Sequence, residues 1–482
     1  MIARYSARLG GWALLIGLAL PRWAAAADVA PAKQPPAPAA KAAKPHVPAA
    51  QPPKAVDDDY EMCKLLIDTI DQVERNYVTK VSRRELIEAA IRGMMSKLDP
   101  YSGYISPREL GRFRASMESE FGGIGVQVAI EGDQLRIISP MCGTPAYRAG
   151  LLAGDRILEI DGRSTDGLTL DEDIGKLKGE EGKPVTLTVI HPGKRDREKI
   201  SLVRQRIHLE TVLGDRRKAD GGWDFMLDPK QGIGYVRLTV FSRDTATRLR
   251  TVLSTLRAQK LRGLILDLRF DPGGLLDAAV EVCNLFVSSG RIVSTKGRNC
   301  PERIWFARKE GTFEGFPMAV LVNHYSASAS EIVAACLQDH KRAVIIGQRT
   351  WGKGSVQNLI DLENGKSALK LTTASYQRPS GKNIHRFPDS KLSDEWGVMP
   401  DQGFEIKLGD EEMLKLLEDR RRRDIVMPAG RSGQAAKTQP PATAKSGSSA
   451  KDAGTRHAGP AVVDRQLQAA VGYLSRELAK AP

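Results

Sequence analysis

Cysteine is scarce in this chain, with five residues among 482. They lie far apart, and none forms a CxxC pair or another spacing typical of metal ligands, so the sequence predicts no metal site and no cofactor. Cys283 and Cys336 fall in apolar helical patterns, where we interpret them as core residues. The odd number leaves at least one thiol unpaired within the chain.

Several motifs of other hydrolytic and nucleotide-binding proteins are missing as well. The chain has no H-E-x-x-H and no other clustered histidine and carboxylate spacing, which disfavours metal-dependent hydrolysis. It has no G-x-S-x-G, the turn that presents the serine of α/β-hydrolases. Residues 347–353 resemble a phosphate-binding loop, but Gly354 stands where the serine or threonine for magnesium is required, which disfavours nucleotide binding.

The net charge of +14 is spread unevenly. Residues 1–55 carry seven Lys/Arg and one Asp, and residues 426–482 carry eight Lys/Arg and three acidic residues, which leaves about +3 for the middle. The Pro/Ala-rich segments 28–55 and 426–460 are predicted to be disordered linkers. We therefore expect no nucleic-acid partner, while contact of the basic linkers with a membrane surface is left open.

Residues 1–27 have the three parts of a secretory signal. Arg4 and Arg8 form the charged start, Gly11–Leu20 is the apolar run, and Ala24–Ala27 offers small residues for cleavage. The run is short for a transmembrane helix, although an uncleaved anchor is left open. We predict an exported protein of the periplasm or cell envelope, with secretion and membrane anchoring left as alternatives.

Helical patterns occupy both ends of the predicted folded chain. In residues 56–118, apolar side chains recur at helical spacing from Tyr60 to Tyr77, and Ser82-Arg-Arg-Glu85 has the form of a capping box that opens a second helix. These features predict an N-terminal helical region. Residues 461–482 predict a C-terminal amphipathic helix.

Residues 119–207 read as short strands separated by glycine turns, around one short helix at residues 145–150. Gly122-Gly-Ile-Gly125 precedes an alternating strand. Such a glycine-rich loop lets successive N–H groups meet a C-terminal carboxylate, while the adjacent strand edge pairs with the peptide tail. The order of these motifs is similar to that of a PDZ domain, which makes Gly122, Gly123, Ile124 and Gly125 the predicted tail-carboxylate site.

Residues 208–425 alternate strands and helices, the pattern of an α/β core. The predicted strands are 234–240, 263–268, 317–323 and 343–346, and the predicted helices are 245–259, 275–287 and 330–339. Asp271-Pro-Gly-Gly274 forms a turn after the second of these strands.

Two segments of this core carry the chemistry. Ser326-Ala-Ser-Ala-Ser-Glu331 places serine in a small-residue turn at the start of a helix, and Trp351-Gly-Lys-Gly-Ser-Val-Gln357 places lysine between two glycines. A serine hydroxyl is a weak nucleophile until a base takes its proton, and a lysine acts as that base when burial lowers its pKa. Either segment alone also fits an ordinary helix start or a surface lysine.

Together the two segments resemble the core of the carboxy-terminal processing peptidases, tail-specific Ser/Lys proteases with an inserted PDZ domain. The resemblance covers roughly residues 58–408 and implies an α/β multi-domain fold. It implies Ser328 as nucleophile, Lys353 as general base and Gln357 as the group that orients Lys353. It also implies an oxyanion site made by the N–H groups of Ala329 and Gly274.

The resemblance has two departures and leaves alternatives open. Phe270-Asp271 stands where the family often has two asparagines before Pro-Gly-Gly, and Trp351 stands where phenylalanine is common. A Ser/His/Asp triad with His324, His340 or His385 competes with the dyad. So does a non-catalytic peptide-binding module on a protease-like scaffold.

The resemblance also bears on partners. It implies protein substrates with exposed apolar C-termini and a PDZ domain that gates the active site. The family's end segment packs on the body or on a partner chain, so a homo-oligomer is left open, as is an adaptor protein.

Overall fold

The computed structural model describes residues 56–116, 120–218, 220–425 and 463–480. The predicted signal at residues 1–27 and the predicted linkers at 28–55 and 426–460 lie outside the described residues. No helix in the described ranges is both long enough and apolar enough to cross a membrane. The chain divides into two compact units.

One unit contains residues 56–114 and 356–374 of the described chain. Its elements are α1 (Val56–Asn76), α2 (Arg83–Ser96), β1 (Gly103–Ile105), α3 (Pro107–Ser116), β20 (Ser355–Leu362) and β21 (Ser367–Gln377), the last two of which pair. The predicted capping box is confirmed, because the Ser82 N–H donates to Glu85 at 3.1 Å and the Glu85 N–H donates to Ser82 Oγ at 3.3 Å.

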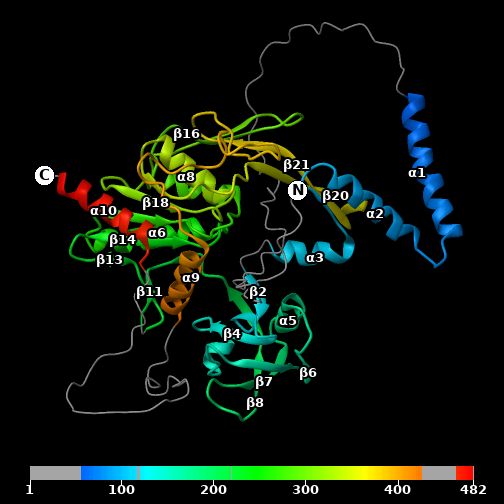
Figure 1. Cartoon of the computed structure of the whole chain (residues 1–482), viewed down its shortest axis with the longest axis horizontal. Helices are drawn as coiled ribbons and strands as arrows, with labels where there is room; N and C mark the ends of the chain where they lie inside the picture. The colour runs from blue at the N-terminus through cyan, green and yellow to red at the C-terminus, as the bar shows by residue number, and fades with distance from the viewer. Residues whose placement is uncertain (1–55, 117–119, 219, 426–462, 481–482) are drawn as a thin grey trace, which may run out of the picture. The chain divides into compact units, whose positions relative to one another are not determined.

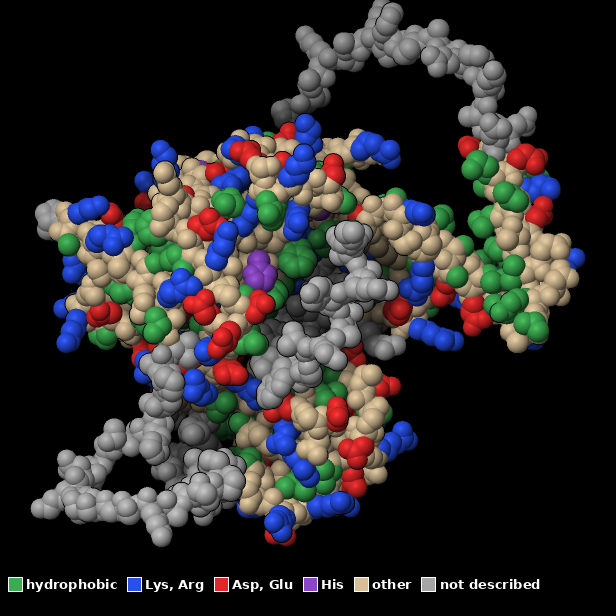
Figure 2. All heavy atoms as spheres, viewed as in Figure 1, with side chains coloured by type: hydrophobic (Ala, Val, Ile, Leu, Met, Phe, Trp, Pro, Cys, Tyr) green, Lys and Arg blue, Asp and Glu red, His purple; other side chains and the backbone are tan. Residues whose placement is uncertain are grey.

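Helix α1 keeps its apolar side chains in solvent. Tyr60, Met62 and Leu65 are 66–69% exposed, and Figure 2 shows hydrophobic side chains along the length of this helix. A single helix cannot bury an apolar stripe against itself, so α1 presents a surface that another element can cover.

In the other unit, residues 120–208 form a small β domain. Its sheet has the order β3-β4-β5-β7-β8, with β6 beside β5, and β2 pairs with β9. The elements are β2 (Glu120–Gly123), β3 (Val126–Glu131), β4 (Gln134–Pro140), α4 (Pro145–Arg148), β5 (Arg156–Ile160), β6 (Arg163–Ser164), α5 (Leu170–Leu177), β7 (Pro184–Ile190), β8 (Glu198–Val203) and β9 (Gln205–His208). Strand β3 is an edge strand, and α5 contacts it.

The same unit contains the α/β core. Its main sheet has the order β10-β14-β15-β18-β19, in which β14, β15, β18 and β19 run parallel and β10 runs antiparallel. These strands are β10 (Val212–Leu213), β14 (Ile233–Leu238), β15 (Gly263–Asp267), β18 (Met318–Val322) and β19 (Val344–Gly347), with β13 (Met226–Asp228) beside β14. Peripheral strands are β11 (Arg216–Arg217), β12 (Trp223–Asp224), β16 (Arg291–Lys296) and β17 (Arg303–Phe306).

Helices cover both faces of this sheet (Figure 1). The helices of this core are α6 (Thr245–Ala258), α7 (Leu276–Asn284), α8 (Ala329–Asp339), α9 (Asp410–Asp424), which contacts β11, and α10 (Arg465–Lys480). A Cβ on Gly234 would meet Leu256 of α6 at 3.1 Å, whereas a Cβ on Gly263 would meet Leu474 of α10 at 3.5 Å. Successive side chains of a strand point to opposite faces of the sheet. Gly234 pairs with the residue after Gly263, so Gly234 and Gly263 face opposite sides, and α6 and α10 therefore cover opposite faces of the sheet.

The C-terminal helix packs on the body of its own chain. Ala470 and Leu474 of α10 are fully buried against the sheet. The buried guanidinium of Arg269 binds Asp267 at 2.7 Å and Asp464, next to α10, at 2.8 Å. Of the two placements that the sequence left open for this helix, the structure therefore shows packing on the body.

Candidate active site

Three loops meet at one edge of the parallel sheet. The Asp271–Gly274 turn follows β15, the Ser328 turn follows β18, and the Lys353 loop follows β19. These strands are neighbours and run parallel, so their carboxyl ends lie side by side. This edge is where α/β sheets commonly bind ligands.

Ser328 stands immediately before α8 with an unusual backbone. Its φ of 57° and ψ of −114° place it at positive φ, which costs a residue with a side chain on the order of 1–3 kcal/mol. The turn is held by Ser326, whose hydroxyl donates to the Leu268 carbonyl at 2.8 Å and accepts the Asn323 N–H at 3.0 Å. Strain fixed by buried hydrogen bonds is typical of a functional position.

The carboxyl group of Glu331 connects the serine turn with the lysine loop. One oxygen accepts the N–H groups of Ser328 and Lys353, each at 2.8 Å. The other accepts the Gly352 N–H at 2.7 Å and the Thr350 hydroxyl. Glu331 is fully buried, and burial raises the pKa of its carboxyl while these hydrogen bonds oppose the rise. All four partners donate, so the ionised carboxylate fits the site.

The two glycines around Lys353 are required by close backbone contacts. A Cβ on Gly354 would lie 2.3 Å from the backbone nitrogen of His385, and a Cβ on Gly352 would lie 2.7 Å from Cβ of Arg386. The Trp351 N–H donates to the Ser326 carbonyl at 3.0 Å, a second link to the serine turn. Lys353 is only 6% exposed, so the alternative of a surface lysine is wrong.

The predicted oxyanion donors lie on loops that touch each other. A Cβ on Gly273 would lie 2.7 Å from the Ala329 nitrogen and 2.5 Å from the Ala327 carbonyl oxygen. The Phe241 N–H donates to the Gly273 carbonyl, and the Phe241 carbonyl accepts the Leu275 N–H. In this parallel pairing the N–H of the residue between them, Gly274, points away from Phe241. Among the described residues, the N–H groups of Gly274 and Ala329 have no acceptor. The structure therefore brings this loop and the start of α8 together.

The departure at Phe270-Asp271 does not leave the glycine loop unbraced. The Phe270 N–H donates to Asn323 Oδ1 at 3.0 Å, and its ring stacks on Tyr325 with 5.6 Å between centroids. The Asp271 carbonyl accepts the Ala327 N–H at 3.1 Å. These contacts hold the loop against the serine turn.

Gln357 belongs to the other compact unit. It is buried on β20, where its amide donates to Thr372 Oγ1 at 3.1 Å. Its role in orienting Lys353 stays a prediction.

The alternatives from the sequence have little support in the described geometry. His340 Nε2 bonds to the Arg291 carbonyl at 2.7 Å, and the His324 ring packs on Tyr325 at 4.0 Å. The N–H groups of Gly352 and Lys353, which a phosphate-binding loop would offer to a nucleotide, are bound to the Glu331 carboxylate instead. A phosphate would meet a buried negative group there.

The predicted tail site is divided between a strand and a turn. Gly122 and Gly123 belong to β2 and pair with Arg206 and Gln205 of β9. Ile124 and Gly125 form the turn into the edge strand β3, and Gly125 has a φ of 76°. A Cβ on Gly125 would lie 2.3 Å from Cβ of Thr144, so glycine is required there.

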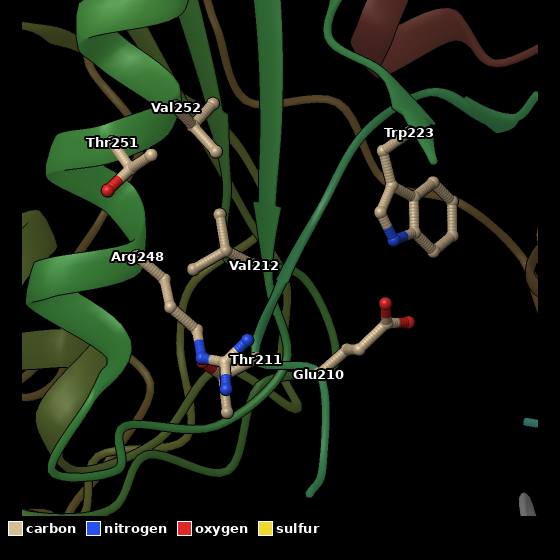
Figure 3. Close-up of a pocket in the computed structure, with 7 residues that line it drawn as sticks. All are labelled: Glu210, Thr211, Val212, Trp223, Arg248, Thr251 and Val252. Atoms are coloured by element: carbon tan, nitrogen blue, oxygen red, sulfur yellow. The ribbon is translucent and has the colours of Figure 1, made fainter. Parts of the chain in front are cut away.

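A cavity of about 260 Å³ lies elsewhere in the core, between α6 and the chain around β10 and β12. Figure 3 shows Arg248 and Thr251 on one side, with Glu210 and Trp223 on the other. None of the predicted site residues lines it, so this cavity is separate from the Ser328 site.

Segments of the chain match known protein families. Residues 232–402 match peptidase family S41, residues 136–190 match a PDZ domain, and residues 36–108 match the activating protease CtpB N-terminal domain. Fold and matches together define a serine-type peptidase with a PDZ domain.

Relatives specify the family further. The carboxy-terminal-processing protease of Bartonella bacilliformis is 39% identical over 363 residues, 72% of this chain and 78% of that protein. The carboxyl-terminal-processing protease of Synechocystis sp. is 35% identical over 343 residues, 70% of this chain and 75% of that protein. CtpB of Bacillus subtilis is 33% identical over 316 residues, 65% of this chain and 64% of that protein.

The chain belongs to the carboxy-terminal processing proteases of peptidase family S41. The resemblance, the α/β multi-domain fold and the assignment as a serine-type peptidase are thereby confirmed.

Sequence reasoning missed the roles of Glu331 and Asp271. Glu331 was visible only as the last residue of the serine motif, although its S-x-x-E spacing from Ser328 is a signal for a carboxylate that bonds the turn. Asp271 was noted only as a departure from the family pattern.

Proposed function

We propose that this peptidase cleaves its substrates with Ser328 as nucleophile and Lys353 as general base. The observation that carries the proposal is the single buried oxygen of Glu331 that accepts the N–H groups of both residues at 2.8 Å. Two segments that lie 25 residues apart in the sequence are thus fixed on one atom. A nucleophile and a base need this kind of fixed relative position.

Each group has a distinct step in this mechanism. The neutral Lys353 amine takes the Ser328 proton as Oγ attacks the scissile carbonyl, and it then returns the proton to the leaving amine. The N–H groups of Ala329 and Gly274 bind the oxyanion of the tetrahedral intermediate. Burial of Lys353 supports its role, because loss of water disfavours the ammonium form.

Acylation of the purified full chain tests the function. We expect an acylating probe to label Ser328 and not the neighbouring Ser326 or Ser330, as mapped by mass spectrometry. The Ser328→Ala variant should take up no label and leave a poorly folded reporter uncut. Cleavage by Ser328→Ala at the wild-type rate would show that another residue is the nucleophile.

We propose further that apolar C-terminal tails select the substrates. Strand β3 is an open edge beside α5, and the Ile124–Gly125 turn leads into it. An extended tail can add to such an edge while its carboxylate meets the N–H groups of the turn. The gating role of the PDZ domain is part of this proposal.

Gly125→Ala is the sharpest change to the tail site. The new Cβ would displace the turn from Thr144, so we expect binding of an apolar-tailed peptide to weaken by about tenfold or more. The variant should also lose the rate difference between reporters with apolar and charged tails. Gly132→Ala is the matched control, since Gly132 also has positive φ but a Cβ there meets nothing within 4 Å. Equal loss in both variants would contradict the assignment.

Export and assembly are proposed from separate features. The signal-like residues 1–27 support export to the periplasm or cell envelope. Recovery of the protein in the cytosolic fraction, with its first 27 residues intact by N-terminal sequencing, would contradict export. The exposed apolar side chains of α1 support association with a second copy of the chain. A monomer in sedimentation at micromolar concentration would contradict this association.

A further inference from the structure

Asp271 has a buried carboxyl group whose two oxygens are unequally bonded. The residue is fully buried, and its Oδ1 accepts the Gly273 N–H at 2.8 Å. Its Oδ2 is buried and has no hydrogen-bond partner among the described residues. An ionised carboxylate would leave a charged oxygen without a donor in the core, which is far more costly than burying a neutral carboxyl.

The backbone of the same residue holds the serine turn from both sides. The Asp271 carbonyl accepts the Ala327 N–H at 3.1 Å and the Ser330 hydroxyl at 3.0 Å. Ser328 lies between these two partners. Asp271 therefore connects the nucleophile turn, through Gly273, with the loop that carries the Gly274 N–H.

The charge of Asp271 matters because of what this loop must do. In the proposed mechanism the Gly274 and Ala329 N–H groups stabilise a negative charge that forms on the substrate oxygen. A second negative charge at Asp271, in the same buried loop, would repel that oxyanion. It would also oppose the gain that the two N–H groups provide.

Other charged groups on the surrounding segments do not neutralise Asp271. They are Arg269 in the same loop after β15, Arg243 and Asp244 beside Phe241, His324 and Glu331 around the serine turn, and Lys353 in the third loop. Arg269 is bound to Asp267 and Asp464, and Asp244 is bound to Arg248. None of the six is a hydrogen-bond or ion-pair partner of the Asp271 carboxyl.

We propose that Asp271 is a positioning residue of the oxyanion site, and that it supports the reaction only while its carboxyl is protonated. The proposal rests on the assignment of Ser328 and its oxyanion donors. Burial raises the pKa of Asp271 to about 7, while the hydrogen bond from the Gly273 N–H opposes the rise. Ionisation therefore falls in the pH range in which the enzyme can be assayed.

The pH profile of kcat/KM tests the proposal. For the wild type we expect an alkaline limb that begins near pH 7 and falls by about tenfold per pH unit. Asp271→Asn keeps the acceptor for Gly273 and cannot ionise, so we expect the alkaline limb to disappear with neutral activity retained. Asp277→Asn is the matched control, because Asp277 is exposed on the helix that follows and should leave the limb in place.

Thermal unfolding provides a measurement that does not depend on activity. The folded wild type keeps the Asp271 proton up to about pH 7, whereas the unfolded chain loses it near the ordinary value of 3.8. Wild-type stability should therefore fall as pH rises between these values, and Asp271→Asn should escape this part of the loss. The variant's melting temperature relative to wild type should rise across the window.

The outcomes separate this proposal from the proposed function. An alkaline limb that persists in Asp271→Asn, with Ser328→Ala inactive at every pH, overturns the role of Asp271 and leaves the nucleophile in place. Activity in Ser328→Ala overturns the function itself. A wild-type profile without an alkaline limb also overturns the role of Asp271, whatever the melting temperatures show.

Discussion

Lys353→Ala should lower kcat/KM by about 10³-fold, within the range that a positioned general base contributes. The physical reason is that no other group is assigned to take the Ser328 proton. The loop should survive, because it is held through the Lys353 N–H and the Trp351 N–H, both backbone groups. Steady-state kinetics on an unfolded reporter, with circular dichroism as the folding check, measures the effect.

Lys353→Arg sharpens this prediction. Arginine has a similar length, but its guanidinium stays protonated and cannot act as a base. We expect this variant to be as inactive as Lys353→Ala. Lys382→Ala is the matched control, an exposed lysine paired with Glu395, and should cleave at nearly the wild-type rate. More than about a tenth of wild-type activity in Lys353→Arg would rule out Lys353 as the base.

The sequence predicted the parts of the fold that depend on local patterns. The helix predicted at residues 245–259 is α6 (Thr245–Ala258), and the strand predicted at 317–323 is β18 (Met318–Val322). Apolar periodicity and buried β-rich runs suffice for such elements. Ser328 and Lys353 could be proposed as site residues in the same way, because their segments carry long, ordered motifs.

Features that depend on distant partners could not be read in this way. Helix α9 was not predicted, since its buried face contains Arg420, whose guanidinium is bound to Asp267 of β15. A charged residue in that position hides the apolar stripe that marks a helix. The packing of α10 on its own sheet was left open for a similar reason, because it depends on the ion pair of Asp464 with Arg269.

The candidate active site also combines features that local sequence patterns predict with features that depend on distant residues. The sequence places Ser328 and Lys353 in the chain, but what fixes them together is the Glu331 carboxylate, three of whose four partners lie 19 to 22 residues beyond it. That connection appears only after β18 and β19 pair in the sheet. Asp271 likewise has an unremarkable place in the sequence, and its burial beside the serine turn is a product of the tertiary fold.

Glu331→Gln should give the second large effect, in both stability and catalysis. Glutamine has the same size, but its NH₂ group must face either the N–H groups of Ser328 and Lys353 or the donors of Gly352 and Thr350. In either orientation the NH₂ group faces two protein donors, and these two donors lose their acceptor. We expect a loss of about 3 kcal/mol in the free energy of unfolding, since each buried unsatisfied donor costs about 1–3 kcal/mol.

The catalytic loss should appear in kcat rather than in KM. Displacement of the Ser328 turn from the Lys353 loop disturbs the attack geometry, and a misplacement of about 1 Å can cost on the order of 10²-fold in rate. The proposed tail site lies in the separate β domain, so KM should change little. Glu331→Asp keeps the charge and should recover part of kcat, whereas a purely steric role would predict better recovery from glutamine.

Urea unfolding and steady-state kinetics on the same preparations of wild type and Glu331→Gln measure the predicted losses in stability and in kcat. Glu310→Gln is the matched control, because Glu310 is exposed and its replacement should change the free energy of unfolding by no more than about 0.5 kcal/mol. Wild-type kcat in Glu331→Gln would mean that the Ser328 and Lys353 loops hold their geometry without this carboxylate. In that case the shared oxygen atom could no longer carry the argument for the dyad, which would then rest on the Ser328 and Lys353 variants alone.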